Sequence, residues 1–140
     1  MRPGASALKL PVALLLSQLT VLVVDPDSDN LELLSAYLQL EGATVLQASS
    51  VAAALEVATS STNPIHAVVS ELLLADGDGC ELLRRLRAQP SRQSVPALAL
   101  TALTDPDWRR RALDGGFQAC ATKPFPLVEL APQLAALCRR

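Results

Sequence analysis

The chain has 140 residues, of which half are hydrophobic and 19% are charged, so its composition predicts one folded domain rather than a disordered chain. Its 12 basic and 14 acidic residues give a net charge of −2, which argues against a nucleic-acid-binding surface. The three cysteines (Cys80, Cys120 and Cys138) include no CxxC pair, which argues against a disulfide framework or a zinc site and favours a cytoplasmic location.

An N-terminal extension, residues 1–18, precedes the predicted domain at 19–140. The extension carries Arg2 and Lys9 and then an apolar stretch, which superficially resembles a secretory signal. Pro11 and Gln18 interrupt this stretch, and it is shorter than the ~20 apolar residues that a membrane-spanning helix needs. We therefore expect no membrane association, and we predict a short helix over residues 12–19.

Five strand–helix units follow in order along the chain. The first strand, 21–24, ends at Asp25-Pro26, and a helix begins near Asn30 and stops at Gly42. The later strands are predicted at 44–48, 67–70, 95–100 and 118–122, and the later helices at 51–59, 79–88, 105–114 and 126–140. Apolar strands that alternate with helices of about ten residues predict an α/β fold, with a parallel sheet covered by helices on both faces.

Two of these helices carry unusual features. The helix that follows the first strand has two apolar stripes, one formed by Leu31, Leu34 and Leu38 and the other by Leu33, Tyr37 and Leu40. We expect the N-terminal extension or another subunit to cover the second stripe. In the last helix, Pro132 interrupts the pattern, so this helix either begins near Pro132 or has an irregular first turn.

Four predicted strands end on residues that carry chemistry, namely Asp25, Glu71, Thr101 and Lys123. The carboxyl ends of parallel strands meet at one edge of a sheet, so we expect these side chains to lie together. Two carboxylates, a hydroxyl and an ammonium group can bind a hard cation, a phosphoryl group or one another. The alternative interpretation is that they are polar residues that simply face the loops.

The chain resembles the receiver domain of two-component response regulators in four places. These are Val-Leu-Val-Val-Asp at 21–25, Glu71 followed by a loop and Gly79, Ala-Leu-Thr-Ala at 99–102, and Thr-Lys-Pro-Phe at 122–125. The resemblance implies a flavodoxin-like (βα)5 fold, a doubly wound parallel sheet with strand order 2-1-3-4-5, and a Lys123–Pro124 peptide bond that is often cis. It also implies phosphorelay signalling, with a histidine kinase or an output or regulatory domain as partner, or a homodimer.

The resemblance also implies a role for each strand-end residue. In that family, an aspartate after the third strand accepts a phosphoryl group, and an acidic pair after the first strand holds Mg²⁺. By position, Asp25 is the first acid of that pair. Thr101 and Lys123 match the hydroxyl and the ammonium group that contact the phosphoryl oxygens. Three positions depart from the family pattern, because Pro26 replaces the second acid, Glu71 replaces the phosphoacceptor aspartate, and Cys120 replaces the aromatic switch residue.

These departures predict a degenerate receiver, or pseudo-receiver, that is not an enzyme. The side chain of Glu71 is longer than that of aspartate, so the attacking carboxylate is displaced by more than ~1 Å and lies within reach of Lys123. A displacement of this size lowers the rate of phosphoryl transfer roughly 100-fold. Because Pro26 offers no side-chain ligand, we expect Mg²⁺ to bind at Asp25 and Glu71 weakly or not at all. Cys120 is too small to act as an aromatic switch. The sequence therefore predicts a protein-interaction module that works without phosphorylation.

Two other functions remain open from the sequence. One is a phosphorylation-competent receiver in which Glu71 accepts the phosphoryl group. The other is a phosphatase of the haloacid-dehalogenase type, with Asp25 as nucleophile and Asp27 as general acid and base. A phosphatase of that type needs a further acidic pair downstream, and only Glu129 follows Lys123.

Two surfaces are candidates for contact with a partner. Receiver relatives use the equivalents of helix 105–114, strand 118–122 and the terminal helix. The alternative surface is the second apolar stripe of the first helix, together with the extension.

Overall fold

The computed structural model describes residues 14–139, which form one parallel sheet with helices on both faces. The strands of this sheet are β1 (Thr20–Val24), β2 (Thr44–Ala48), β3 (Ala67–Ser70), β6 (Ala97–Thr101) and β7 (Ala119–Thr122). Their order across the sheet is β2-β1-β3-β6-β7, which confirms the predicted order 2-1-3-4-5 for the five main strands. Two short strands that we did not predict, β4 (Leu73–Leu74) and β5 (Gly77–Asp78), pair as an antiparallel hairpin.

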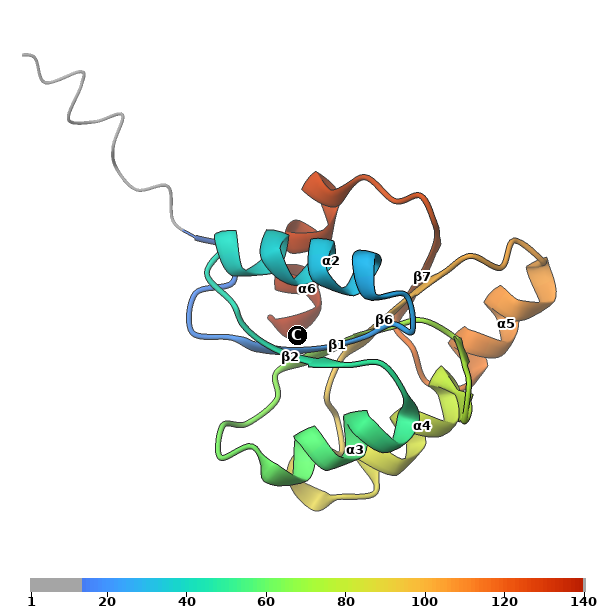
Figure 1. The fold of residues 1–140 in the computed structure, drawn as a ribbon, viewed down its shortest axis with the longest axis horizontal. Coiled ribbons are helices and arrows are strands. Elements are labelled where there is room, and N and C mark those ends of the chain that lie inside the picture. The colour runs from blue at the N-terminus through green and yellow to red at the C-terminus, as the bar shows by residue number, and fades with distance from the viewer. Residues whose placement is uncertain (1–13, 140) are drawn as a thin grey trace, which may run out of the picture.

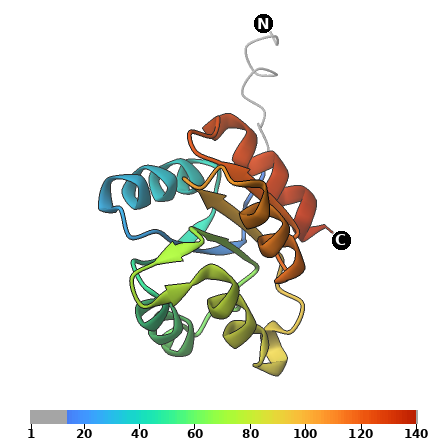
Figure 2. The same ribbon diagram turned by 90° about the vertical axis from the view of Figure 1, so that its right-hand side faces the viewer.

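In residues 14–139, five α-helices cover the two faces of the sheet, and Figures 1 and 2 show how they are arranged. They are α2 (Ser28–Leu40), α3 (Val51–Ser60), α4 (Gly79–Arg87), α5 (Pro106–Asp114) and α6 (Leu130–Cys138). Side chains alternate along each strand, so Leu22 and Val24 face the layer of α3, α4 and α5, whereas Val21 and Val23 face α2 and α6. Within residues 14–139, none of the helices has the length and apolar character needed to cross a membrane.

Four helices begin at a residue whose side chain caps the first turn. Asp27, Ser50, Asp78 and Asp105 cap α2, α3, α4 and α5, each by accepting hydrogen bonds from backbone N–H groups of the first turn. The last helix has an irregular start, because a 3-10 turn at Leu127–Glu129 precedes it. Pro132 is then the third residue of α6. The N–H groups of the first helical turn have no carbonyl acceptor within the helix, so a proline at this position removes no hydrogen bond.

The predicted helix over residues 12–19 is wrong for its described part, because residues 15–18 form a turn; Val12 and Ala13 lie outside the described residues. The backbone of this segment forms hydrogen bonds with residues that are distant in the sequence. The N–H of Leu16 donates to the carbonyl of Glu41 at 2.9 Å, and the carbonyl of Leu19 accepts from Thr44 at 2.9 Å. The Leu16 side chain is fully buried in the core beside α2, so it belongs to the folded domain.

The first residue of α4, Gly79, packs against the end of β3. A Cβ atom at Gly79 would lie 2.8 Å from the carbonyl oxygen of Glu71, which belongs to the backbone and cannot rotate away. Gly79→Ala should therefore lower the free energy of unfolding by about 1–3 kcal/mol. In an unhindered helix the same change raises it by about 0.5–1 kcal/mol.

Urea denaturation checks this prediction, with the exposed Arg84→Ala in the same helix as control. The control should stay within about 0.5 kcal/mol of the wild type. A Gly79→Ala variant as stable as the wild type would show that β3 and α4 are not in close contact.

Candidate functional site

Four residues from separate strand ends meet at the carboxyl edge of the sheet, as the sequence predicted. Asp25 follows β1, Glu71 follows β3, Thr101 ends β6 and Lys123 follows β7. The Lys123 Nζ atom lies 2.7 Å from Asp25 Oδ2 and 2.9 Å from Glu71 Oε1. We call these four residues the strand-edge cluster. The Lys123–Pro124 peptide bond is cis, as the family resemblance implied.

The Asp25 carboxylate is buried, with 1% of the residue exposed, and neighbouring donors satisfy it. Oδ1 accepts a hydrogen bond from the N–H of Asp27 at 2.9 Å. Oδ2 accepts from Asn30 Nδ2 at 2.8 Å and from Lys123. Asn30 was not among the residues that we predicted for the site. Its place in the first turn of the helix that follows Asp25 was the available signal.

The Glu71 carboxylate is also buried, with 6% of the residue exposed, and backbone N–H groups hold it. Oε2 accepts from the N–H groups of Leu72 at 2.7 Å and Leu73 at 3.3 Å. Oε1 accepts from Lys123 Nζ and from the N–H of Ala102 at 3.3 Å. The side chain of Glu71 therefore connects β3 to the loop that follows β6.

The pKa shifts of Glu71 and Lys123 favour the ionised form of both side chains. Burial raises the pKa of Glu71, but hydrogen bonds from the Thr101 hydroxyl and the Lys123 ammonium outweigh burial and leave this pKa below its usual value of 4.5. Burial lowers the pKa of Lys123, but bonds to Asp25 and Glu71 leave it above 10.5. At neutral pH Glu71 is therefore a carboxylate and Lys123 an ammonium ion.

The arrangement of the cluster does not fit a Mg²⁺ ion. Asp25 Oδ1 accepts a hydrogen bond from the N–H of Asp27, and Asp25 Oδ2 accepts from Asn30 and Lys123. The Glu71 carboxylate accepts from Lys123, from the Thr101 hydroxyl and from three backbone N–H groups. Pro26 offers no side-chain ligand, and the Asp27 carboxylate accepts from the N–H groups at the start of α2. Mg²⁺ requires near-octahedral oxygen coordination, which this set of oxygens does not provide. Across residues 14–139, no three His, Cys, Asp or Glu side chains lie close enough to hold a metal.

Cys120, at the position of the aromatic switch residue, packs into the core on the α3, α4 and α5 side of the sheet. The residue is 7% exposed, and burial raises the pKa of its thiol. Thr101 is 1% exposed, and its hydroxyl accepts from the N–H of Leu103 at 3.1 Å. A small thiol in this place cannot exchange between buried and exposed rotamers as an aromatic ring can.

The loop that follows Glu71 is attached to α3, which the sequence analysis did not predict. The Asp76 carboxylate accepts from the N–H groups of Val51 at 2.8 Å and Ala52 at 3.0 Å. These bonds hold the pKa of Asp76 below its usual value. The loop beside the cluster is thus fixed to the start of a neighbouring helix.

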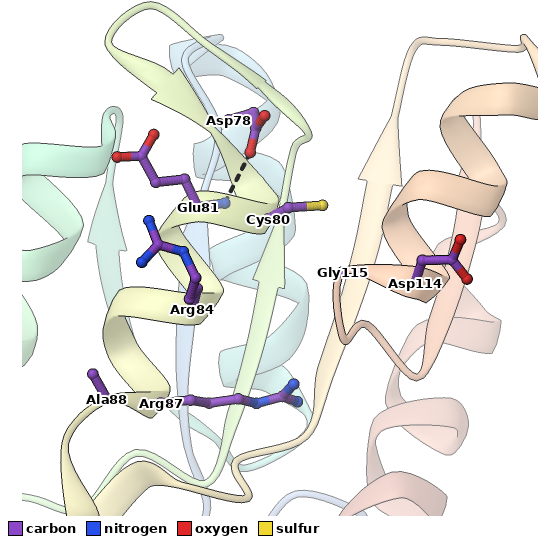
Figure 3. Close-up of a pocket in the computed structure, with 8 residues that line it drawn as sticks. All are labelled: Asp78, Cys80, Glu81, Arg84, Arg87, Ala88, Asp114 and Gly115. Carbon is purple, nitrogen blue, oxygen red and sulfur yellow. Dashed lines mark hydrogen bonds between the residues drawn. The ribbon is translucent and has the colours of Figure 1, made fainter.

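A groove of about 760 Å³ between α4 and α5 shares no residue with the strand-edge cluster. Figure 3 shows the Cys80 sulfur pointing toward α5, while Glu81 and Arg84 extend from the opposite side of α4. Carbonyl oxygens of Val95 and Gly116 accept from the guanidinium of Arg87. With three acidic and two basic residues in its lining, the groove carries no uniform charge.

The pKa shifts predict how stability depends on pH. Glu71 contributes stability that is present above pH 4.5 and is lost as the pH falls through its lowered pKa. Lys123 contributes stability that is present below pH 10.5 and is lost as the pH rises through its raised pKa. Between about pH 5 and 3, the free energy of unfolding should therefore fall less in Glu71→Gln than in the wild type. Urea denaturation at a series of pH values measures both slopes, and parallel curves would contradict the prediction.

The comparisons with known proteins agree with this geometry. The family model of the response regulator receiver domain matches residues 21–135. The "uncharacterized 14.6 kDa protein in sodA1 3'region" of Leptolyngbya boryana is 36% identical over 123 residues, which cover 88% of this chain and 92% of that protein. The transcriptional regulatory protein PrrA of Mycobacterium tuberculosis is 38% identical over 120 residues, 86% of this chain and 50% of PrrA. The chain thus spans half the length of this curated relative.

Solved structures give the same result. A putative response regulator from Chloroflexus aurantiacus matches with a TM-score of 0.78 and 30% identity, over 86% of this chain and 98% of that one. A two-component response regulator from Clostridium difficile matches with a TM-score of 0.77 and 26% identity, over 88% and 98%. With its sheet order and strand-end residues, this chain belongs to the family of response regulator receiver domains.

Proposed function

We propose that this receiver domain is a pseudo-receiver, which acts through protein contacts without being phosphorylated. The observation that carries the proposal is the position of the Glu71 carboxylate, bonded to Lys123 and to the N–H groups of Leu72, Leu73 and Ala102. An internal anion occupies these donors permanently. The domain then has one fixed arrangement at this edge, set by its sequence.

The chemistry of phosphoryl transfer supports the proposal. The acceptor oxygen has to approach the phosphorus in line, and catalysis relies on positioning and charge neutralisation. Both Glu71 oxygens are held by donors of the protein, and Pro26 removes a ligand for the metal ion that neutralises charge in the family. The phosphatase alternative has less support, because the Asp27 carboxylate caps α2.

We place the partner surface on α5, β7 and α6. A hollow of about 660 Å³ opens there, lined in part by Arg109, Leu113 and Phe125. Leu113 is 45% exposed, so the surface offers apolar contact beside a positive charge. A histidine kinase, an output or regulatory domain, or a second copy of this chain in the cytoplasm fits this proposal. The matching segment makes up half of PrrA, a transcriptional regulatory protein.

Exposure to a phosphoryl donor tests the proposal. The full chain is incubated with Mg²⁺ and acetyl phosphate and examined by intact mass spectrometry, and with beryllofluoride by NMR. We expect no phospho-adduct and no shift of the backbone resonances of Glu71 or Ala102. The DrrB receiver domain, whose structure is described as BeF3 activated, is the positive control. An adduct on Glu71 would overturn the proposal and establish the phosphorylation-competent receiver instead.

A further inference from the structure

The sheet ends at β2 on one side and at β7 on the other, and the outer side of β2 is open. The N–H of Thr44 and the carbonyl of Ala48 form hydrogen bonds of 2.9 Å and 3.1 Å with the residues that flank β1. Alternate residues of a strand direct their backbone groups to the same side, so the groups of Val45 and Gln47 face away from β1. Across residues 14–139, no hydrogen bond reaches these outward N–H and C=O groups. We call the four groups of Val45 and Gln47 the open edge.

The composition of β2 leaves the open edge unprotected. Edge strands in stable proteins commonly carry a charged residue, a proline or a bulge that prevents another strand from pairing. β2 reads Thr-Val-Leu-Gln-Ala and pairs with β1 through five consecutive residues, so it has no charge, no proline and no bulge. The strand at the other end, β7, has four residues and is followed directly by Lys123 and Pro124. The open edge can therefore pair with a further strand through backbone hydrogen bonds.

Apolar side chains lie on both sides of the open edge. On the α3 side, a hollow of about 510 Å³ is lined by Leu46, Val57 and polar residues near the end of α3. On the α2 side, Val45 and Tyr37 pack against the core and are half-buried. Figure 1 shows β2 between these two helices. A strand added at the open edge would therefore place alternate side chains beside apolar surface on each face of the sheet.

The segment that contains α2, β2 and α3 is uniformly acidic. Between residues 26 and 65 the chain has no lysine, arginine or histidine, and its five acidic residues there are Asp27, Asp29, Glu32, Glu41 and Glu56. Within residues 14–139, every lysine and arginine lies from Arg84 onward. A second copy of the chain paired through β2 would bring this acidic segment against itself. A segment that carries lysine or arginine complements it instead.

We propose that the open edge of β2 binds an extended segment of a partner protein, rich in basic and apolar residues, which joins the main sheet as a sixth strand. The backbone groups of Val45 and Gln47 supply the hydrogen bonds, and the apolar side chains beside them favour apolar residues in the partner. Glu56, which is exposed and lines the hollow, favours lysine or arginine. Because β2 and β7 are opposite ends of the sheet, this surface is separate from the partner surface on α5, β7 and α6.

A designed peptide tests the proposal on the full chain. The probe is acetyl-Lys-Thr-Val-Val-Leu-Lys-amide, which places one lysine on each face when it is extended. In an NMR titration, we expect saturable shifts of the backbone N–H resonances of Val45 and Gln47, because both groups gain hydrogen bonds. Two control peptides, one N-methylated at both valines and one with glutamate in place of lysine, should each bind at least roughly tenfold more weakly.

Variants of the chain then locate the binding. Gln47→Pro removes an outward N–H group, and edge strands tolerate proline at such a position. We expect Gln47→Pro and Glu56→Lys each to weaken binding of the probe at least roughly fivefold. Asp114→Lys makes the same change of charge at the end of α5 and should alter the affinity less than about twofold. The N-methylated peptide tests backbone pairing on the wild type, so the outcome does not depend on the folding of Gln47→Pro.

Two results would overturn the proposal. One is equal binding of the three peptides, or shifts that rise linearly without saturation, because neither indicates backbone pairing at β2. The other is a dimer in sedimentation equilibrium that Gln47→Pro dissociates and the probe does not. A dimer of this kind would assign the open edge to a second copy of the chain.

Discussion

Lys123→Met is expected to lower the free energy of unfolding by about 3–5 kcal/mol at neutral pH. The methionine side chain has nearly the same length, so the packing of the stem is kept and the charge is lost. Asp25 and Glu71, which are 1% and 6% exposed, would then be two buried carboxylates without a counter-ion. Urea denaturation at pH 7 measures the loss.

A matched control separates this effect from that of an ordinary surface charge. Arg85 pairs with Glu81 at 3.8 Å in α4, and both side chains are about half exposed. Arg85→Met should change stability by less than about 1 kcal/mol. The loss in the free energy of unfolding caused by Lys123→Met should also become smaller toward acid pH, because a proton bound to a carboxylate replaces the missing ammonium charge. A deficit equal to that of the control would mean that the Lys123 bonds contribute little to stability.

Restoring the two family acids, through Pro26→Asp with Glu71→Asp, should produce saturable Mg²⁺ binding and a beryllofluoride response, which we do not expect of the wild type. Shortening Glu71 withdraws its carboxylate from the N–H of Ala102 and frees the donors that now hold it. A carboxylate at position 26 supplies a second anionic oxygen beside Asp25 Oδ1. NMR titration of the full chain with Mg²⁺, then with beryllofluoride, measures both responses.

The single variants show which position matters more. Pro26→Asp alone keeps the Glu71–Lys123 bond, so we expect weak metal binding and no beryllofluoride response. Glu71→Asp alone lacks the second acid, so we expect it to bind the metal less tightly than the double variant. If the double variant behaves as the wild type does, these two positions do not account for the proposed loss of phosphorylation, and Cys120 becomes the next position to restore.

Much of the fold could be predicted from local patterns. The apolar runs at 21–24 and 67–70 are buried strands because they lie in the middle of a parallel sheet. Asp27 and Ser50 cap α2 and α3, as aspartate and serine commonly do before a helix. The segment before β1 could not be predicted in this way. Its backbone bonds to Glu41 and Thr44, which are distant in sequence, override its helical pattern.

The candidate site could be predicted only in part. Side chains at strand ends converge because the topology brings them together, so Asp25, Thr101 and Lys123 could be placed from the sequence. The contact between Glu71 and Lys123 could also be predicted from the length of the glutamate side chain, but the other partners could not. The N–H groups that hold Glu71 belong to backbone whose direction no residue pattern reveals, and the bond from Asp76 to α3 depends on an unpredicted hairpin.

The burial of Asp25 and Glu71 determines how the ion pairs of the strand-edge cluster respond to ionic strength. Mobile ions screen exposed charges, with a screening length of about 8 Å at physiological salt. Added salt therefore weakens exposed surface pairs such as Arg110–Asp107. The Lys123 side chain is 22% exposed and its partners Asp25 and Glu71 are 2% and 7% exposed, so added salt should weaken these bonds less than it weakens surface pairs. A rise in ionic strength should therefore disturb this edge of the domain less than it disturbs the exposed ion pairs of α4 and α5.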